Sequence, residues 1–246
     1  MQELALESAI NSIRVRFGSQ ALTRAAEMPP PQPWSSGSPV DRLTGIGGLP
    51  RGRLSLFTGG GTCGKLTLAL SLLARATHEF AHTVVVDAGG FDPWTLTPFS
   101  PELGALTVVR APAPEVAGEA TATLARAGAG FLLLMAEVPQ HWLGPLESAA
   151  NRSGSVVLGV LDAPNHALAH ASSFSLGFTR TDWIFERDQL VGLRLSARCV
   201  KNRVAAPVGE TELEVRYPLG PVQPWDYTAG IRHSEMEVGQ CASAVV

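Results

Sequence analysis

Lysine is almost absent from this chain of 246 residues: of its 19 basic side chains, only Lys65 and Lys201 are lysine. The three cysteines, Cys63, Cys199 and Cys241, are far apart, which excludes a disulfide framework and a metal site built from cysteine pairs. No apolar run approaches the roughly 20 residues of a membrane-spanning helix, and the acidic start lacks the pattern of a signal peptide. We expect a cytoplasmic protein with no membrane segment.

The charge balance is close to neutral, with 19 basic against 22 acidic residues and a net charge of -3. That excludes a protein that grips nucleic acid over its whole surface and leaves room for a local basic patch. Because 45% of the residues are apolar, the chain can bury a sizeable core and is not wholly disordered. Where arginine dominates so strongly, a retained lysine is either one whose compact ammonium is needed or a simple leftover.

Residues 3–17 are predicted to form a short helix with a narrow apolar stripe. Its apolar side chains recur at spacings of four, three and four residues: Leu6, Ile10, Ile13 and Phe17. A helix this short is marginal in water, so its apolar stripe must dock, either on its own core or on another subunit.

Proline is concentrated in residues 28–40, which predicts a semi-rigid linker. We therefore divide the chain into four parts: an N-terminal docking element (1–27), the linker (28–40), a core (41–219) and a C-terminal tail (220–246). The tail has no clear periodicity, and Trp225 makes it a candidate partner-binding strip.

The core alternates short apolar strands with helical stretches. The predicted strands are 54–58, 83–87, 106–110, 131–136 and 155–161, and the predicted helices are 66–76, 116–127 and 145–151. Continuous apolar strands between helices indicate a parallel sheet covered on both faces. Three further strands at 182–187, 191–200 and 211–217 indicate an antiparallel extension near the C-terminus. The predicted fold class is α/β, a mostly parallel twisted sheet flanked by helices.

The strongest motif follows the first core strand. Gly59, four further residues and then Gly64 and Lys65 have the spacing of a phosphate-binding loop. In such loops backbone N–H groups at a helix N-terminus cradle phosphate oxygens, and the lysine adds a point charge. The candidate phosphate-binding residues are Gly59, Gly61, Gly64 and Lys65.

The residue after that lysine departs from the motif. A serine or threonine there would hold Mg²⁺, but this chain has Leu66, and Thr67 lies about 100° further round the helix. Leucine cannot coordinate a hard cation, and Mg²⁺ normally bridges the β- and γ-phosphates during transfer. The sequence therefore predicts phosphate binding without efficient hydrolysis.

The chain resembles the RecA-type recombinases in two further blocks. Residues 43–53 (LTGIGGLPRGR) are similar to that family's lead-in to the phosphate loop, and residues 200–207 (VKNRVAAP) to a block near the end of its core. Residues 13–25 are similar to the family's N-terminal helix and following strand, which dock on the neighbouring subunit of a filament. The resemblance covers roughly residues 5–220 and implies a RecA-like phosphate-loop core.

The resemblance also implies two carboxylates that this chain lacks. In the family, the strand after the first crossover ends in Asp-Ala-Glu, whose glutamate activates the attacking water; here Gly89 takes its place. The next strand should end in the aspartate of the second nucleotide motif, but Ala136 stands there, and alternation puts the adjacent Glu137 on the opposite face. Together with Leu66, these losses predict an inactive ATPase with no catalytic residues.

Further positions bear on whether the chain binds nucleotide and DNA. Asp92 matches a residue beside the adenine, so the resemblance implies that ATP or ADP can bind without efficient hydrolysis, and we expect no required cofactor or metal. The family's two DNA-binding loops should lie within residues 137–179, where Arg152 is the only arginine or lysine. Because phosphate neutralisation supplies most of the affinity for DNA, we expect weak or no direct DNA binding.

Lys201 and Arg203 match two cations that, in the recombinases, reach across the subunit interface to the neighbour's ATP. A chain that keeps them together with a docking helix is predicted to contact a genuine recombinase; a solvated turn is the alternative. The candidate partner-interface residues are Leu6, Ile10, Ile13, Phe17, Lys201, Arg203 and Trp225.

Within the family, this combination most resembles the ImuA group of short, RecA-like proteins with a degenerate nucleotide site. That resemblance implies an accessory role in the SOS response to DNA damage, with two partners: RecA, whose filament it would inhibit, and ImuB, an inactive Y-family-like subunit of a translesion polymerase complex. The implied location is the nucleoid. The alternatives are a weak DNA-dependent ATPase, with Asp87 or Glu137 recruited as a metal ligand, and a nucleotide sensor that binds without turnover.

Overall fold

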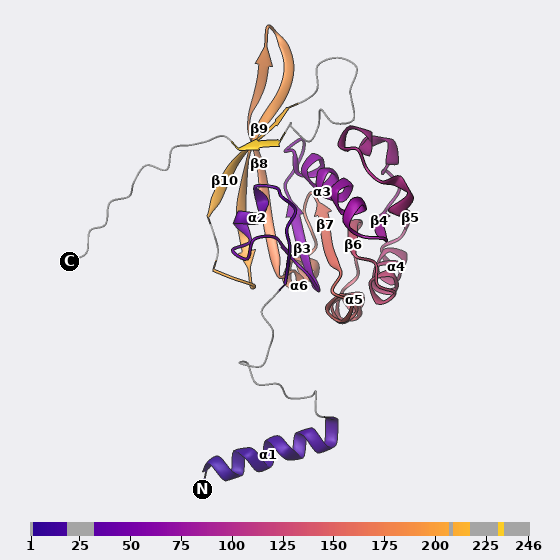
Figure 1. Cartoon of the computed structure of the whole chain (residues 1–246), viewed down its shortest axis with the longest axis vertical. Coiled ribbons are helices and arrows are strands. Elements are labelled where there is room, and N and C mark those ends of the chain that lie inside the picture. The colour runs from indigo at the N-terminus through magenta and orange to yellow at the C-terminus, as the bar shows by residue number, and fades with distance from the viewer. Residues whose placement is uncertain (1, 19–31, 207–208, 217–230, 234–246) are drawn as a thin grey trace, which may run out of the picture. The chain divides into compact units, whose positions relative to one another are not determined.

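The computed structural model describes residues 2–18, 32–206, 209–216 and 231–233 (Figure 1). They fall into two compact units, Met1–Pro31 and Gln32–Val246. The described part of the first unit, residues 2–18, forms the helix α1 (Gln2–Phe17), as the apolar spacing predicted. Gly18 ends this helix with φ +92°, and its N–H donates to the carbonyl of Arg14 at 2.9 Å.

The second unit is an α/β core. Its elements are β1 (Pro33–Trp34), α2 (Val40–Leu43), β2 (Leu49–Pro50), β3 (Arg53–Thr58), α3 (Lys65–Glu79), β4 (Thr83–Asp87), η3 (Pro93–Phe99), η4 (Leu103–Ala105), β5 (Leu106–Arg110), α4 (Pro114–Arg126), β6 (Phe131–Met135), α5 (Gln140–Ser153), β7 (Val156–Leu161), α6 (His166–Ala171), β8 (Phe174–Glu186), β9 (Gln189–Asn202), β10 (Glu210–Arg216) and β11 (Ile231–His233).

One sheet organises the core, with strand order β11-β10-β9-β8-β3-β7-β6-β4-β5. The pairs from β8 to β5 are parallel, and β9, β10 and β11 extend the sheet in antiparallel fashion. This is the mostly parallel sheet with an antiparallel extension that the sequence predicted. Strand β3, which precedes the phosphate loop, lies between β8 and β7.

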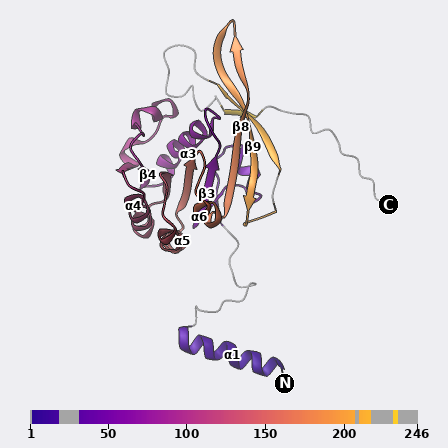
Figure 2. The ribbon, with the colours of Figure 1, turned by 180° about the vertical axis from the view of Figure 1, so that it is seen from behind.

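Helices cover both faces of the parallel strands (Figures 1 and 2). Because successive strand residues point to opposite faces, Phe131 and Leu133 join the cluster under α3, while Leu132 and Leu134 join the cluster under α4 and α5. Both faces are therefore apolar, and this explains the continuous apolar runs in the sequence.

Strands β8 and β9 form a long hairpin that projects beyond the rest of the core (Figure 1). At its tip, Arg187 and Asp188 turn the chain with φ values of +48° and +63°. The predicted strand 182–187 is thus only the outer half of β8, which begins at Phe174 beside β3. The predicted tail also contains a strand, since β11 pairs with β10.

The prediction of a linker over residues 28–40 is wrong for residues 32–40, which belong to the core. Trp34 is buried: its ring packs edge-on against Phe131 at 5.1 Å between centroids, and its Nε1 donates to Glu79 at 2.6 Å. The carboxylate of Asp41 accepts hydrogen bonds from the hydroxyl of Ser36 and other groups of this segment. An aromatic anchor and a satisfied carboxylate outweigh the proline content. Residues 28–31 lie outside the described part of the chain.

Trp34→Ala should lower the free energy of unfolding by about 3–5 kcal/mol, because it removes a large buried ring and leaves a cavity. Trp94→Ala is the matched control, since that indole is 73% exposed. Chemical denaturation of both variants measures the difference. Equal, near-neutral effects would show that the segment around Trp34 acts as a linker after all.

Candidate phosphate-binding site and partner surfaces

The phosphate loop connects the end of β3 to the start of α3. Two of its glycines have backbone conformations and close neighbours that exclude a side chain. Gly59 has φ +148°, and a Cβ there would lie 2.4 Å from the carbonyl oxygen of Phe178 on β8. Gly64 has φ +80° and precedes Lys65 at the helix start, and a Cβ there would lie 2.4 Å from Leu195. Gly61 lies between them, so the four candidate phosphate-binding residues form one loop.

Lys65 is almost fully buried, with 7% of its surface exposed. Its Nζ donates to the carbonyl of Gly59 at 2.6 Å and to Oδ1 of Asp162 at 2.5 Å. Asp162 follows β7, the strand beside β3, and our sequence analysis missed it. The signal was present, because ligand sites in such sheets gather at the carboxyl ends of neighbouring strands.

The metal position of the loop is apolar. Leu66 is the second residue of α3 and is 40% exposed. Thr67, one residue further along the helix, is partly buried. A leucine side chain offers no oxygen to a cation. Among the described residues, no group of three or more His, Cys, Asp or Glu side chains is arranged to hold a metal ion.

Asp87 at the end of β4 is occupied in holding the loop that follows it. Its buried carboxylate accepts hydrogen bonds from the N–H groups of Gly89 at 2.9 Å and Phe91 at 2.8 Å, and from the guanidinium of Arg110 at 2.6 Å. Burial acts to raise the pKa of Asp87, but these hydrogen bonds and the charge of Arg110 outweigh it and lower the pKa. Arg110 also donates to the carbonyl of Phe91.

The carboxyl end of β6 carries no acid that points toward Lys65. Ala136 is buried there. Oε2 of Glu137 accepts a hydrogen bond from Nδ2 of Asn165 at 2.5 Å, and Asn165 caps the start of α6. Both carboxylates that the ATPase alternative would recruit, on Asp87 and Glu137, therefore have other partners.

Asp92 lies in the segment after β4, apart in sequence from the phosphate loop. It caps η3, because its Oδ1 accepts a hydrogen bond from the N–H of Trp94 at 3.0 Å. No described contact joins Asp92 to the phosphate loop. Its carboxylate thus has a structural function, and the adenine pocket implied by the resemblance stays a prediction.

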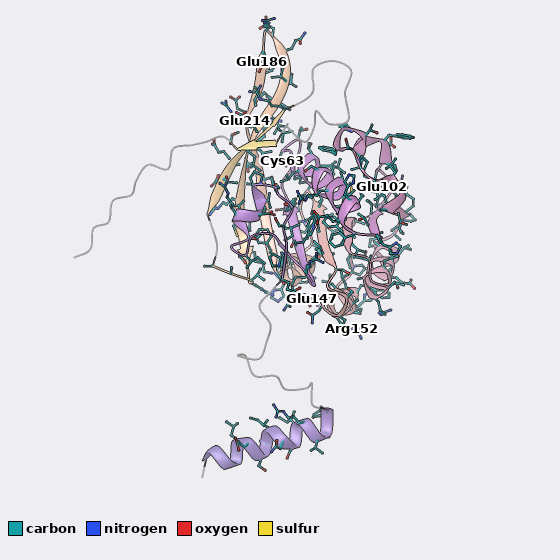
Figure 3. The ribbon with its side chains drawn as sticks, viewed as in Figure 1. Cys63, Glu102, Glu147, Arg152, Glu186 and Glu214 are labelled. Atoms are coloured by element: carbon teal, nitrogen blue, oxygen red, sulfur yellow. The ribbon has the colours of Figure 1, made fainter. Side chains whose placement is uncertain are left out.

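Lys201 and Arg203 lie at the end of the core opposite the phosphate loop. The N–H of Arg203 donates to the carbonyl of Ser173, and the N–H of Ser173 donates to the carbonyl of Leu54 near the start of β3, whereas the loop follows the carboxyl end of that strand. Figure 3 shows the same separation, with Cys63 of the phosphate loop far from Glu147 of α5, which lines a groove together with Arg203.

That groove has a volume of about 470 Å³ and is lined by Gln140, Leu143, Glu147, His166, His170 and Arg203 among others. Lys201 is directed inward instead: its Nζ donates to the carbonyls of Ala169 at 2.8 Å and His170 at 2.6 Å, at the end of α6. Burial, and then the charge of Arg203, lower the pKa of Lys201. Of the two cations, only Arg203 is exposed.

The other predicted interface residues are on α1 and in the tail. Leu6, Ile13 and Phe17 are 62%, 40% and 65% exposed, and Ile10 is half-buried. The apolar stripe therefore has no core within the described part of its own unit. Trp225 lies outside the described residues. No described helix is long and apolar enough to cross a membrane.

A glycine-rich loop between an interior strand of a mostly parallel sheet and a helix, with a buried lysine at the helix start, defines a phosphate-loop protein of the α/β class. The sequence profile of the RecA N-terminal domain matches residues 4–141. The chain belongs to the RecA family. It is 30% identical to Protein RecA of Chlorobaculum tepidum over 87% of this chain and 75% of that protein. It is 28% identical to Protein RecA of Gluconobacter oxydans, over 88% and 75%.

The Asp87 network makes a prediction about stability in acid. Because the folded-state pKa of Asp87 is lowered, its contribution is complete above the ordinary carboxyl pKa of about 3.9 and is lost as the pH falls through the lowered value. Asp87→Asn should therefore cost about 1–3 kcal/mol of unfolding free energy at pH 7. The difference from wild type should shrink below pH 4 or so.

Urea unfolding of both proteins across this pH range measures the effect. Asp188→Asn, which removes an exposed carboxylate at the hairpin tip, is the control and should change stability little. A constant difference between wild type and Asp87→Asn at all pH values would contradict the ionic role of this carboxylate.

Proposed function

We propose that this chain is a RecA-family accessory protein that binds RecA without hydrolysing ATP. It inhibits the RecA filament and links it to a translesion polymerase complex through ImuB, an inactive Y-family-like subunit, during the SOS response. The setting is cytoplasmic and nucleoid-associated. One observation carries the proposal: Arg203 is exposed at the end of the core opposite the chain's own phosphate loop.

Arg203 is the first of these features. Because it is exposed at the amino ends of the parallel strands, it cannot reach the phosphate loop at their carboxyl ends. An exposed guanidinium in a groove suits a carboxylate or phosphate on a partner. The position therefore supports contact with a neighbouring subunit over a role in the chain's own site.

The apolar stripe of α1 is the second feature. A single amphipathic helix is stabilised mainly by packing its apolar face. Leu6, Ile13 and Phe17 are exposed in a unit whose described residues are this helix and Gly18. This supports docking of α1 on another protein, and RecA, as a relative of this chain, is the candidate.

The third feature is the edge of the sheet formed by strand β5. Strand β5 ends the order of the sheet and pairs only with β4 among the described strands. An unpaired strand edge can accept a strand from a partner through backbone hydrogen bonds. A chain with a docking helix and an open edge can join the end of a filament of related subunits.

The absence of hydrolysis is supported by three positions that lack oxygen ligands or a base: Leu66, Gly89 and Ala136. The nearest substitutes, Asp87 and Glu137, are bonded to Arg110 and Asn165. Weak DNA binding is supported by the segments after β6 and β7, residues 136–139 and 162–165, which contain no arginine or lysine.

The test mixes the full chain with RecA and measures binding by light scattering or surface plasmon resonance, together with RecA strand exchange. Wild type should bind RecA and inhibit exchange. Arg203→Glu should weaken binding by about tenfold or more, because it places a carboxylate where the partner presents an anion.

Arg126→Glu, at the exposed end of α4, is the matched control and should leave binding unchanged. The double substitution Leu6→Ser/Phe17→Ser tests α1 in the same assays. A wild-type chain that neither binds RecA nor alters strand exchange would refute the proposal.

A weak ATPase is the second candidate, and one observation favours it: Asp162 brings a carboxylate to the phosphate loop. Steady-state hydrolysis of ATP with Mg²⁺ discriminates the two functions. Turnover above background that Lys65→Ala abolishes would favour the enzyme, and its absence supports the accessory protein.

A further inference from the structure

We propose that the carboxylate of Asp162 is an internal occupant of the phosphate loop. It pairs with Lys65 where a ligand's phosphate would otherwise bind, so a nucleoside diphosphate or triphosphate enters the loop only by displacing it. This inference concerns the phosphate loop alone and does not depend on RecA binding.

The burial of Lys65 is the first step of the argument. A buried ammonium without a counter-charge is costly, and lysines are almost never buried unless they are paired. The carbonyl of Gly59 satisfies one hydrogen bond but brings no full charge. Asp162 supplies the charge at 2.5 Å, so the buried ammonium is paired within the protein itself.

The backbone holds Asp162 at the loop. The N–H of Gly59 donates to the carbonyl oxygen of Asp162 at 3.2 Å, and this bond joins the first residue of the loop to the end of β7. The carboxylate therefore reaches Lys65 from a fixed point on the neighbouring strand. In Figure 3 this end of the core is marked by Cys63.

The side chain of Asp162 can also leave. Its side chain is 74% exposed, compared with 9% for the side chain of Lys65. When a phosphate binds Lys65, the carboxylate can turn into water, where it is well solvated. The carboxylate of Asp162 and the phosphate of a ligand would therefore compete for the same ammonium group, that of Lys65.

A metal-ligand role for Asp162 is the alternative. A carboxylate beside phosphates either repels them or is bridged to them by Mg²⁺. Leu66 removes the usual oxygen beside that cation, and the described residues offer no set of three metal-ligating side chains. One carboxylate on the lysine is thus better placed to compete with a phosphate than to hold a metal.

The test is ADP binding measured by isothermal titration calorimetry on the full chain, once in EDTA and once with Mg²⁺. Asp162→Asn should bind ADP about tenfold or more tightly than wild type in EDTA, because the competing charge is gone while the side-chain shape is kept. Mg²⁺ should change the affinity of neither protein. Lys65→Ala should abolish binding.

Asp188→Asn is the matched control, since it removes one negative charge far along the hairpin from the loop and should leave ADP affinity unchanged. Equal or weaker binding by Asp162→Asn overturns the inference, as does failure of both proteins to bind ADP. Loss of a Mg²⁺-dependent affinity in Asp162→Asn would identify a metal ligand and also overturns it.

A measurement on the wild-type chain keeps the inference testable if Asp162→Asn does not fold. The chain has only two lysines, so side-chain ¹⁵N labelling gives two ammonium signals, which Lys201→Arg assigns. The signal of Lys65 should be protected from exchange with water in the ligand-free protein and should shift when ADP is added. Rapid exchange in the ligand-free protein, as in a solvated lysine, would exclude the pair.

Discussion

Covering both faces of the parallel sheet is the constraint on which the other features depend. Because helices pack on each face, side chains along β4, β6 and β7 are almost all apolar. Polar side chains are therefore accommodated only at the ends of these strands. The carboxyl ends are where the phosphate loop, Asp87 and Asp162 gather. Any change in the chemistry of such a protein is therefore expected at strand ends, where a substitution leaves the packing of the sheet intact.

The two ends of the sheet carry charged groups in different settings. At the carboxyl ends, carboxylates that remain are used for internal contacts: Asp87 with Arg110, and Asp162 with Lys65. At the amino ends, Arg203 stays exposed in a groove. Our two proposals together describe a subunit that combines an internally paired phosphate loop with an exposed surface for a partner. That combination suits a protein whose partner supplies the chemistry, which is the function we propose.

Much of this architecture could be predicted from sequence. The runs ending at Thr58 and Asp87 gave two strands, because buried parallel strands are continuously apolar, and the spacing from Gly59 to Lys65 located the loop. The segment around Trp34 was misjudged because its burial depends on Phe131, which is almost 100 residues away. Asp162 was missed although it directly follows a predicted strand: the pattern marks it as a strand-end residue, but its contact with Lys65 depends on β7 lying beside β3, and strand order is not encoded by local pattern.

The inward direction of Lys201 has a consequence for recognition. Its ammonium donates hydrogen bonds to the carbonyls of Ala169 and His170 at the end of α6. Within residues 200–206, the exposed positive charge is therefore that of the Arg203 guanidinium. A guanidinium is a flat fork that binds two oxygens of one carboxylate or phosphate at once, whereas an ammonium attracts anions without regard to their shape. The surface should therefore favour anions that present two oxygens side by side to the fork, and exchanging arginine for lysine at position 203 would preserve the charge while losing that selectivity.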